Sequence, residues 1–266
     1  MDNNVLYALG LTLFAGLSTG IGSFIAAFTK NRSQRFLSVA LGFSAGVMIY
    51  ISFVEILPHA SHTMHLHFNS ITSEWVTLAA FFGGMLIIAI IDKLVPSYEN
   101  PHEMPGIDAM EKTPDKQARM KRLGILSAIA IAVHNFPEGI ATFMSSYQEP
   151  ELGLPIAIAI AIHNIPEGIA VAVPIYYATG SRLKAFNLSF LSGLSEPVGA
   201  ILAFLILMPF LNDLIMGVVF ASVAGIMVFI SIDELLPAAE EYGEHHLSIY
   251  GLVAGMGVMA VSLIVI

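Results

Sequence analysis

The chain contains no cysteine, few charged residues and only one tryptophan. The absence of cysteine excludes disulfide bonds and thiolate metal sites. Charged types make up 12% of the 266 residues and apolar types 56%, whereas roughly a quarter of an average globular protein is charged. The formal charge of −9, with only 11 Lys and Arg, argues against a nucleic-acid-binding protein. Residues 1–28 also lack the basic region and cleavage site of a secretory signal, so the first apolar run is interpreted as a retained helix.

Long apolar runs dominate the rest of the sequence. Eight of them can each supply the ~20 residues that cross a bilayer, and together they use most of the chain. The predicted spans, numbered 1 to 8, are residues 5–28, 36–57, 75–95, 123–146, 152–176, 185–209, 213–236 and 247–266. The connection 96–122, rich in proline and charge, is predicted to be a flexible loop. The sequence therefore predicts an all-α integral membrane protein with a single transmembrane domain, residues 1–266, in contact with the lipid bilayer.

The basic residues indicate how the spans are oriented. They lie between spans 1 and 2, at the connection of spans 3 and 4, and between spans 5 and 6: Lys30, Arg32, Arg35, Lys93, Lys112, Lys116, Arg119, Lys121, Arg122, Arg182 and Lys184. With eight crossings, these three connections all face the same side of the membrane. The positive-inside rule predicts that this side is the cytoplasm, which puts both termini outside.

Three pairs of short motifs repeat within the chain. The motif His-Asn-x-Pro-Glu-Gly at 134–139 in span 4 recurs at 163–168 in span 5. The two other pairs relate residues 16–22 to 193–199 and residues 55–58 to 234–237; for these shorter pairs, chance similarity in an apolar background is the alternative. Each pair joins spans separated by an odd number of crossings, so its members run antiparallel. This pattern is typical of transporters built as inverted repeats, here with spans 1–3 related to spans 6–8.

The longer motif places metal-binding side chains on one face of each span. In both copies the His and the Glu are four residues apart, so imidazole and carboxylate share a helix face, and the neighbouring Asn can add an amide oxygen. Two such helices facing each other would offer a mixed set that suits Zn²⁺ and other first-row divalent ions. The candidate ligands are His134, Asn135, Glu138, His163, Asn164 and Glu167. Pro137 and Pro166 should kink the two helices and free a carbonyl in each.

Electrostatics strengthens the metal-site interpretation. Glu138, Glu167 and Glu196 lie more than ~10 residues from the ends of their apolar runs, near the middle of the bilayer, and the apolar cores of the eight spans hold no Lys or Arg. At roughly 3 kcal/mol each, three uncompensated acidic residues would cost about 9 kcal/mol on insertion. Divalent cations would neutralise them, and so would protonation. The alternative is that the histidines are packing residues and the protonated glutamates join helices by hydrogen bonds.

Other polar residues lie toward the ends of spans. Glu55 and His59 near the outer end of span 2, and Asp233 and Glu234 near the inner end of span 7, are candidates for an entrance and an exit; interfacial acids without a function are the alternative. The outer connection 58–74 contains four histidines and is interpreted either as a polar loop or as a weak collector of cations. Glycines spaced four apart predict close helix packing: Gly16 and Gly20, Gly42 and Gly46, and Gly251 and Gly255.

The paired His-Asn-x-Pro-Glu-Gly motif resembles that of the ZIP (Zrt/Irt-like) family of metal transporters, and the likeness extends over essentially the whole chain. The resemblance implies a 3+2+3 helix bundle in the bacterial cytoplasmic (inner) membrane that moves zinc, with iron, manganese, cobalt and cadmium as further candidates, into the cytosol. It also implies a binuclear site in which His134, Glu138, His163 and Glu167 hold one ion. In this implied site, Asn135, Asn164 and Glu196 would join the two glutamates around the other ion. A homodimer is left open.

An intramembrane metal-dependent protease is the alternative from another class, because His and Glu on membrane helices also build catalytic zinc sites. Such proteases use His-Glu-x-x-His, a motif that this sequence lacks. The symmetric duplication of ligands suits a transport pathway better than a one-sided catalytic pocket. The sequence therefore predicts a transporter and not an enzyme, with an ion channel open as a variant.

Overall fold

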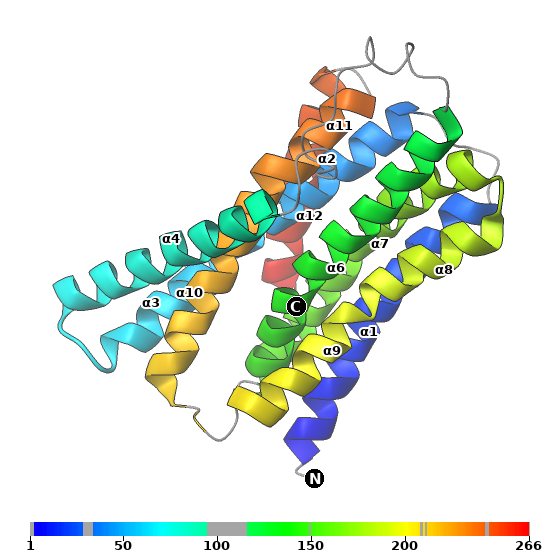
Figure 1. The fold of residues 1–266 in the computed structure, drawn as a ribbon. Coiled ribbons are helices and arrows are strands. Elements are labelled where there is room, and N and C mark those ends of the chain that lie inside the picture. The colour runs from blue at the N-terminus through cyan, green and yellow to red at the C-terminus, as the bar shows by residue number, and fades with distance from the viewer. Residues whose placement is uncertain are drawn as a thin grey trace.

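Figure 1 shows the computed structural model, in which nearly every described residue is helical. The structure describes residues 3–28, 34–94, 116–148, 150–207, 210, 212–242 and 245–265. Within these ranges further side chains, many of them in the first third of α6 and including that of His134, lie outside the description. So does most of the predicted loop 96–122. No strand occurs among the described residues, in agreement with the predicted all-α class.

The helices alternate in direction along a bundle (Figure 1). In chain order they are α1 (Asn3–Phe28), α2 (Gln34–Ile51), η1 (Ser52–Ile56), α3 (Leu57–His65), α4 (Ser70–Leu94), α6 (Lys116–Gln148), α7 (Pro150–Thr179), α8 (Arg182–Gly193), α9 (Ser195–Leu202), η2 (Ala203–Leu207), α10 (Asp213–Ile230), η4 (Ser231–Leu235), α11 (Leu236–Tyr242) and α12 (His245–Val265). The α3, α4 and α10 helices lie on one side and α1, α8 and α9 on the other, with α6 and α7 between them.

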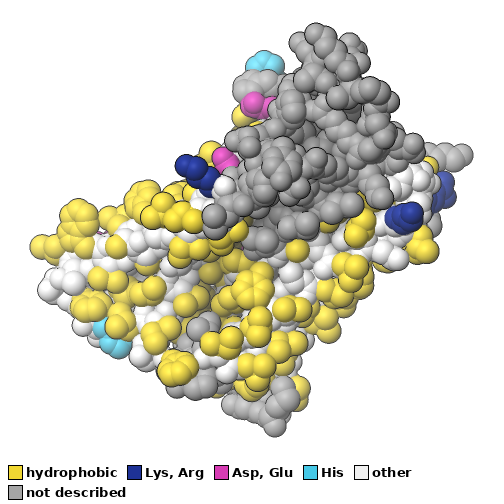
Figure 2. Space-filling model, in the orientation of Figure 1, with side chains coloured by type: hydrophobic (Ala, Val, Ile, Leu, Met, Phe, Trp, Pro, Cys, Tyr) yellow, Lys and Arg dark blue, Asp and Glu magenta, His cyan; other side chains and the backbone are white. Residues whose placement is uncertain are grey.

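Seven helical stretches among the described residues are long and apolar enough to cross a membrane. The 33-residue α6 is long enough to cross as well. The helices differ in how deeply they are buried. In α7, 82% of the most apolar stretch is buried, compared with only 22% in α4 or α12, so α7 lies in the core of the bundle and α4 and α12 lie at its periphery. Hydrophobic side chains cover much of the face seen in Figure 2. The chain is therefore an all-α integral membrane protein, while its division into eight crossings stays a prediction.

The two ends of the bundle differ in charge. Arg35 lies in the first turn of α2, Lys93 in the last turn of α4, and Arg182 and Lys184 in the first turn of α8, and all four side chains are exposed. We call this the basic end; Figure 2 shows dark blue Lys and Arg side chains toward the upper end of the face in view. The opposite end carries the turn between α3 and α4 with His65 and His67, and we call it the histidine end.

Prolines change the helical geometry in some spans and not in others. Short π-helices, η1 and η4, precede Pro58 and Pro237, and in each the next residue bonds back five positions, to the carbonyl of Ser52 or Ser231. Such a shift accommodates a residue that lacks the N–H of the helical ladder. The helix also breaks at Leu194, between α8 and α9, just before Glu196 and Pro197. In contrast, α6 and α7 run unbroken through Pro137 and Pro166.

Glycines mark where helix backbones touch, and their contacts occur in matched pairs. A Cβ atom at Gly46 of α2 would meet the carbonyl oxygen of Leu252 in α12, and one at Gly225 of α10 would meet that of Phe81 in α4. The same relation links α1 and α7 with α9 and α6: the pairs are Gly22 with Ile165 and Gly199 with Phe136. The predicted glycine packing is confirmed, since Gly16, Gly20, Gly42, Gly46, Gly251 and Gly255 all lie against a neighbouring helix. Exchanging spans 1–3 with spans 6–8 maps one set of contacts onto the other, which supports the predicted inverted repeat.

Candidate metal centre

The paired motif lies in the middle of the bundle. The α6 helix carries the first copy, α7 carries the second, and α9 carries Glu196 in its first turn. Five ligand candidates with described side chains, and Glu196 beside them, have at most 1% of their surface exposed: Asn135, Glu138, His163, Asn164, Glu167 and Glu196. Complete burial of three carboxylates is costly unless they are compensated, so their partners decide what the site can do.

The closest imidazole–carboxylate pair joins the two copies of the motif. The Nε2 atom of His163 in α7 lies 3.1 Å from Oε1 and 3.3 Å from Oε2 of Glu138 in α6. With its proton on Nε2, the imidazole donates to both oxygens of the carboxylate. A divalent cation between the same two side chains would be held by one nitrogen and one or two oxygens, which is ordinary zinc coordination.

A second polar cluster connects α7 to α1 and α9. The side-chain amide of Asn164 donates to the Ala15 carbonyl at 3.0 Å and also to Oε1 of Glu196. Both N–H groups of Asn164 are thereby used. Its Oδ1 atom and Oε2 of Glu196 are buried without a hydrogen-bond donor among the described residues. The two oxygens are acceptors only, so a cation satisfies them without any added donor.

The third cluster surrounds Glu167 and includes a residue that the sequence did not point to. With its amide nitrogen turned toward α7, Asn135 donates to Oε2 of Glu167 at 3.2 Å and to the Ile131 carbonyl at 3.1 Å. The hydroxyl of Ser44 in α2 lies 3.3 Å from both Oε1 of Glu167 and the carbonyl oxygen of His163, and its single proton is shared between these two acceptors. Ser44 is fully buried, so α2 contributes to the site.

The residues present fit a divalent cation by their chemistry. Carboxylate, imidazole and amide groups are the donors that first-row divalent ions use, and each unsatisfied buried acceptor costs about 1–3 kcal/mol until it gains a partner. Among the described side chains, however, no group of three His, Asp or Glu residues is close enough to hold one ion. The predicted fourth ligand of the first ion, His134, has a side chain outside the description.

The entrance and exit candidates lie toward opposite ends of the bundle. Glu55 in η1 and His59 in α3 are half-buried and line one pocket toward the histidine end. Asp233 and Glu234 are half-buried in η4, toward the basic end. The structure thus separates these two pairs from each other and from the central clusters.

The histidines of the outer connection make separate contacts. Nε2 of His65 lies 3.6 Å from Oε1 of Glu74 in α4, and Nε2 of His67 lies 3.7 Å from Oδ2 of Asp213 in α10. Their side chains are more than a third exposed, and both contacts link the turn to a neighbouring helix. The geometry is compatible with a polar connection and with weak cation binding, so both interpretations stay open.

Comparison with known proteins decides the family. The family model described as ZIP zinc transporter matches residues 2–117 and 97–263, which together make up nearly the whole chain. The chain belongs to the ZIP family. Among its ZIP relatives, the zinc transporter ZupT of Lysinibacillus sphaericus is 61% identical over 268 residues and 100% of both chains. Those of Chlorobium limicola and Streptococcus mutans are 61% and 58% identical over 264 residues, 99% of each chain.

ZIP membership confirms the family that the paired motif predicted. ZIP proteins are transporters and not enzymes, so the predicted absence of an enzymatic activity agrees with the family. The intramembrane protease alternative has no support, because the chain lacks a His-Glu-x-x-His motif and matches a transporter family over nearly its full length.

Proposed function

We propose that this ZIP protein takes up Zn²⁺, and also Fe²⁺, Mn²⁺, Co²⁺ and Cd²⁺, across the bacterial cytoplasmic membrane into the cytosol. One observation carries the proposal: three fully buried glutamates lie beside imidazole and amide groups in spans whose apolar cores contain no Lys or Arg. A visiting doubly charged ion compensates such a cluster. The names of the curated relatives, all zinc transporters called ZupT, point to the same cargo.

The proposed ligand set is binuclear. Glu138 and His163, which already touch, hold the first ion together with His134 and Glu167. Asn135, Asn164 and Glu196 join the two glutamates around the second ion, where Oδ1 of Asn164 and Oε2 of Glu196 are the acceptors without a donor among the described residues. Carboxylates that bridge two ions keep the total charge of the occupied centre low. Low net charge suits a site surrounded by apolar side chains.

Orientation follows from the distribution of basic residues. The positive-inside rule places the basic end in the cytoplasm and the histidine end outside, so metal enters near Glu55 and His59 and leaves past Asp233 and Glu234. Alternating access then requires the helices around the site to move against each other. The π-helices η1 and η4, one in each repeat, lie in the spans that carry these entrance and exit residues.

Flux through the purified protein tests the proposal directly. Liposomes containing the protein and a trapped zinc-sensitive dye should accumulate Zn²⁺ down its gradient, because the centre exposes ligands to each side in turn. Fe²⁺, Mn²⁺, Co²⁺ and Cd²⁺ should compete with zinc, and a pH gradient switched on and off will show whether protons are coupled. Flux no faster than that of empty liposomes would refute the proposal.

Ser44 provides a test of the geometry around Glu167. Ser44→Ala removes the hydroxyl that donates to Oε1 of Glu167, so the carboxylate loses its orientation, and the KM for zinc uptake should rise about tenfold with little change in kcat. Ser38→Ala is the matched control, because Ser38 is buried in the same helix without a hydrogen-bond partner among the described residues. Equal KM values for the two variants would show that the Ser44 hydroxyl does not orient Glu167 for metal binding.

A further inference from the structure

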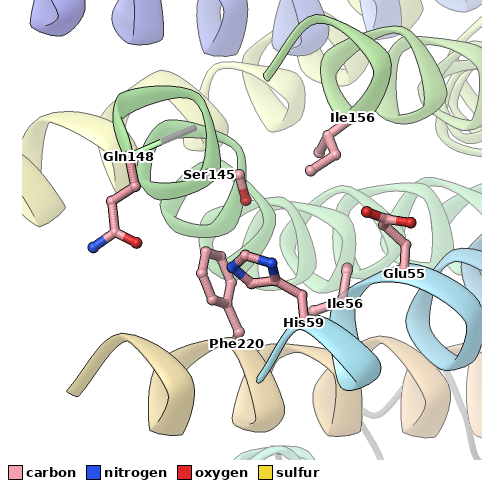
Figure 3. Close-up of a pocket in the computed structure, with 7 residues that line it drawn as sticks. All are labelled: Glu55, Ile56, His59, Ser145, Gln148, Ile156 and Phe220. Carbon is pink, nitrogen blue, oxygen red and sulfur yellow. The ribbon is translucent and has the colours of Figure 1, made fainter. Parts of the chain in front are cut away.

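A pocket toward the histidine end brings together polar side chains from distant parts of the chain. Glu55 and His59 come from η1 and α3, Ser145 and Gln148 from the last turns of α6, and Ile156 and Phe220 from α7 and α10. Figure 3 shows the Glu55 carboxylate and the His59 imidazole extending into the space between these helices, with Ser145 and Gln148 on the opposite wall. The pocket is therefore formed by tertiary packing, and one helix alone does not make it.

The lining has the chemistry of a weak cation site. It offers one carboxylate, one imidazole and two neutral oxygen-bearing groups, a mixed set that first-row divalent ions accept. The His59 ring lies edge-on to Phe220, with ring centroids 5.1 Å apart and an interplanar angle of 83°, and this contact limits how the imidazole can turn. With only two strong ligands, the pocket would hold an ion loosely and release it readily.

The pocket lies where an incoming ion would bind before it reaches the buried centre. Ser145 is seven residues from Glu138 along α6, and Ile156 is seven residues from His163 along α7. Seven residues are close to two helical turns, so both pairs share a helix face and lie about 10 Å apart along the axis. An ion in the pocket is thus two turns outward from the Glu138–His163 pair, on the same faces of the same helices.

The internal repeat shows that this pocket differs from its counterpart at the other end. Glu55-Ile56-Leu57-Pro58 matches Glu234-Leu235-Leu236-Pro237, so the position equivalent to His59 is Ala238. Of these two equivalent positions, only 59 carries an imidazole. The segment at the other end of the bundle, η4, instead carries two carboxylates, Asp233 and Glu234. Nitrogen ligands favour zinc-like ions over Mg²⁺ and Ca²⁺, which prefer oxygen. A nitrogen donor at only one of these two equivalent positions gives the two positions different metal preferences.

We propose that the Glu55–His59 pocket is a separate capture site, in which an incoming zinc-like cation binds before it moves to the buried centre. The inference rests on the proposed function, since it assumes that metal crosses from the histidine end to the basic end. The pocket concentrates zinc-like ions at the mouth of the pathway and discriminates against Mg²⁺ and Ca²⁺. The ligands that hold the ion during transport are those of the buried centre, and the pocket contributes none of them.

Uptake kinetics test the role of the pocket. His59→Ala and Glu55→Gln should each raise the KM for zinc uptake about tenfold while the maximal rate stays within about twofold, because the capture step fails but the buried centre is intact. His62→Ala is the matched control: His62 belongs to the same helix, is exposed and does not line the pocket, and its KM should be unchanged. Unaltered KM values in both pocket variants would overturn the capture site.

Metal binding without transport separates this inference from the proposed function. In a Glu138→Gln/Glu167→Gln protein purified in detergent, Co²⁺ should still produce the visible absorption of a nitrogen- and oxygen-bound ion. Adding His59→Ala should abolish that band, and adding His62→Ala should not. A band independent of His59 would defeat the capture site even if transport is confirmed. A band that depends on His59, together with no flux in liposomes containing the natural chain, would retain the site and remove the transport proposal.

Discussion

Glu138→Gln and Glu167→Gln should each reduce zinc uptake by about a hundredfold or more, since each removes a proposed ligand and even the loss of a supporting partner costs metal sites 10- to 100-fold. The substitutions keep side-chain volume and replace one carboxylate oxygen by an amide nitrogen. Glutamine at 138 can still accept from His163, so the fold should survive. Removing a buried charge also lowers the desolvation cost of folding, and the variants should be at least as stable as the natural chain.

The measurement is radioactive zinc uptake into vesicles, together with the amount of inserted protein and its thermal unfolding in detergent. Glu151→Gln is the matched control, because Glu151 is an exposed acid in the first turn of α7, and it should transport normally. Normal uptake by both Glu138→Gln and Glu167→Gln would remove these residues from the ligand set. Loss of uptake together with loss of inserted protein would assign them a structural role.

Much of the fold could be predicted because its determinants are local in sequence. Apolar runs of bilayer length predict helices directly, and the duplicated motif identified the two helices that carry the central polar residues. The close packing at Gly42, Gly46, Gly251 and Gly255 was also predictable, since small residues four apart leave one helix face open to a neighbour. In each case the necessary information lies within a single helix.

The pairing inside the site could not be predicted in the same way. Helical spacing puts His163 on the same face as Glu167, yet His163 contacts Glu138 of the other copy, and Asn164 donates to Glu196. Ser44 carried no signal at all, because its counterpart in the repeat is the apolar Val223. These contacts depend on how α2, α6, α7 and α9 are placed relative to one another, and the order of residues along any one helix does not fix that placement.

The capture pocket depends on tertiary placement as well. The place of Glu55 and His59 near the outer end of span 2 predicts an entrance, whereas only helix packing brings Ser145, Gln148 and Phe220 to the same pocket. The internal repeat accounts for one of the two strong ligands of the pocket and not for the other. Glu55 has a counterpart at Glu234, whereas His59 is a departure from the repeat, and such departures are where the two ends of the pathway acquire different chemistry.

Gly168→Ala should disable transport although it alters no proposed ligand. A methyl group at this position would meet the carbonyl oxygen of Thr19 in α1 and lie 3.0 Å from the Ser23 nitrogen, so the α7 and α1 backbones must separate. Overpacking of this kind costs about 1–3 kcal/mol. Gly168 directly follows Glu167, and displacement of α7 shifts that carboxylate relative to Asn135 and Ser44. Since displacements of about 1 Å can cost a hundredfold in a positioned site, uptake should fall by at least about tenfold.

The control for this variant is Gly10→Ala in α1, where an added Cβ has no neighbour within 4 Å. Alanine favours the helix by up to about 1 kcal/mol over glycine, so Gly10→Ala should unfold at the same or a higher temperature and transport normally. Gly168→Ala should unfold at a lower temperature and bind zinc more weakly in detergent. If Gly168→Ala matched the natural chain in both unfolding and uptake, α1 and α7 would not be in the close contact on which the geometry of the centre depends. The position of Glu167 is thus set by a backbone contact one residue away, and a single methyl group is enough to test it.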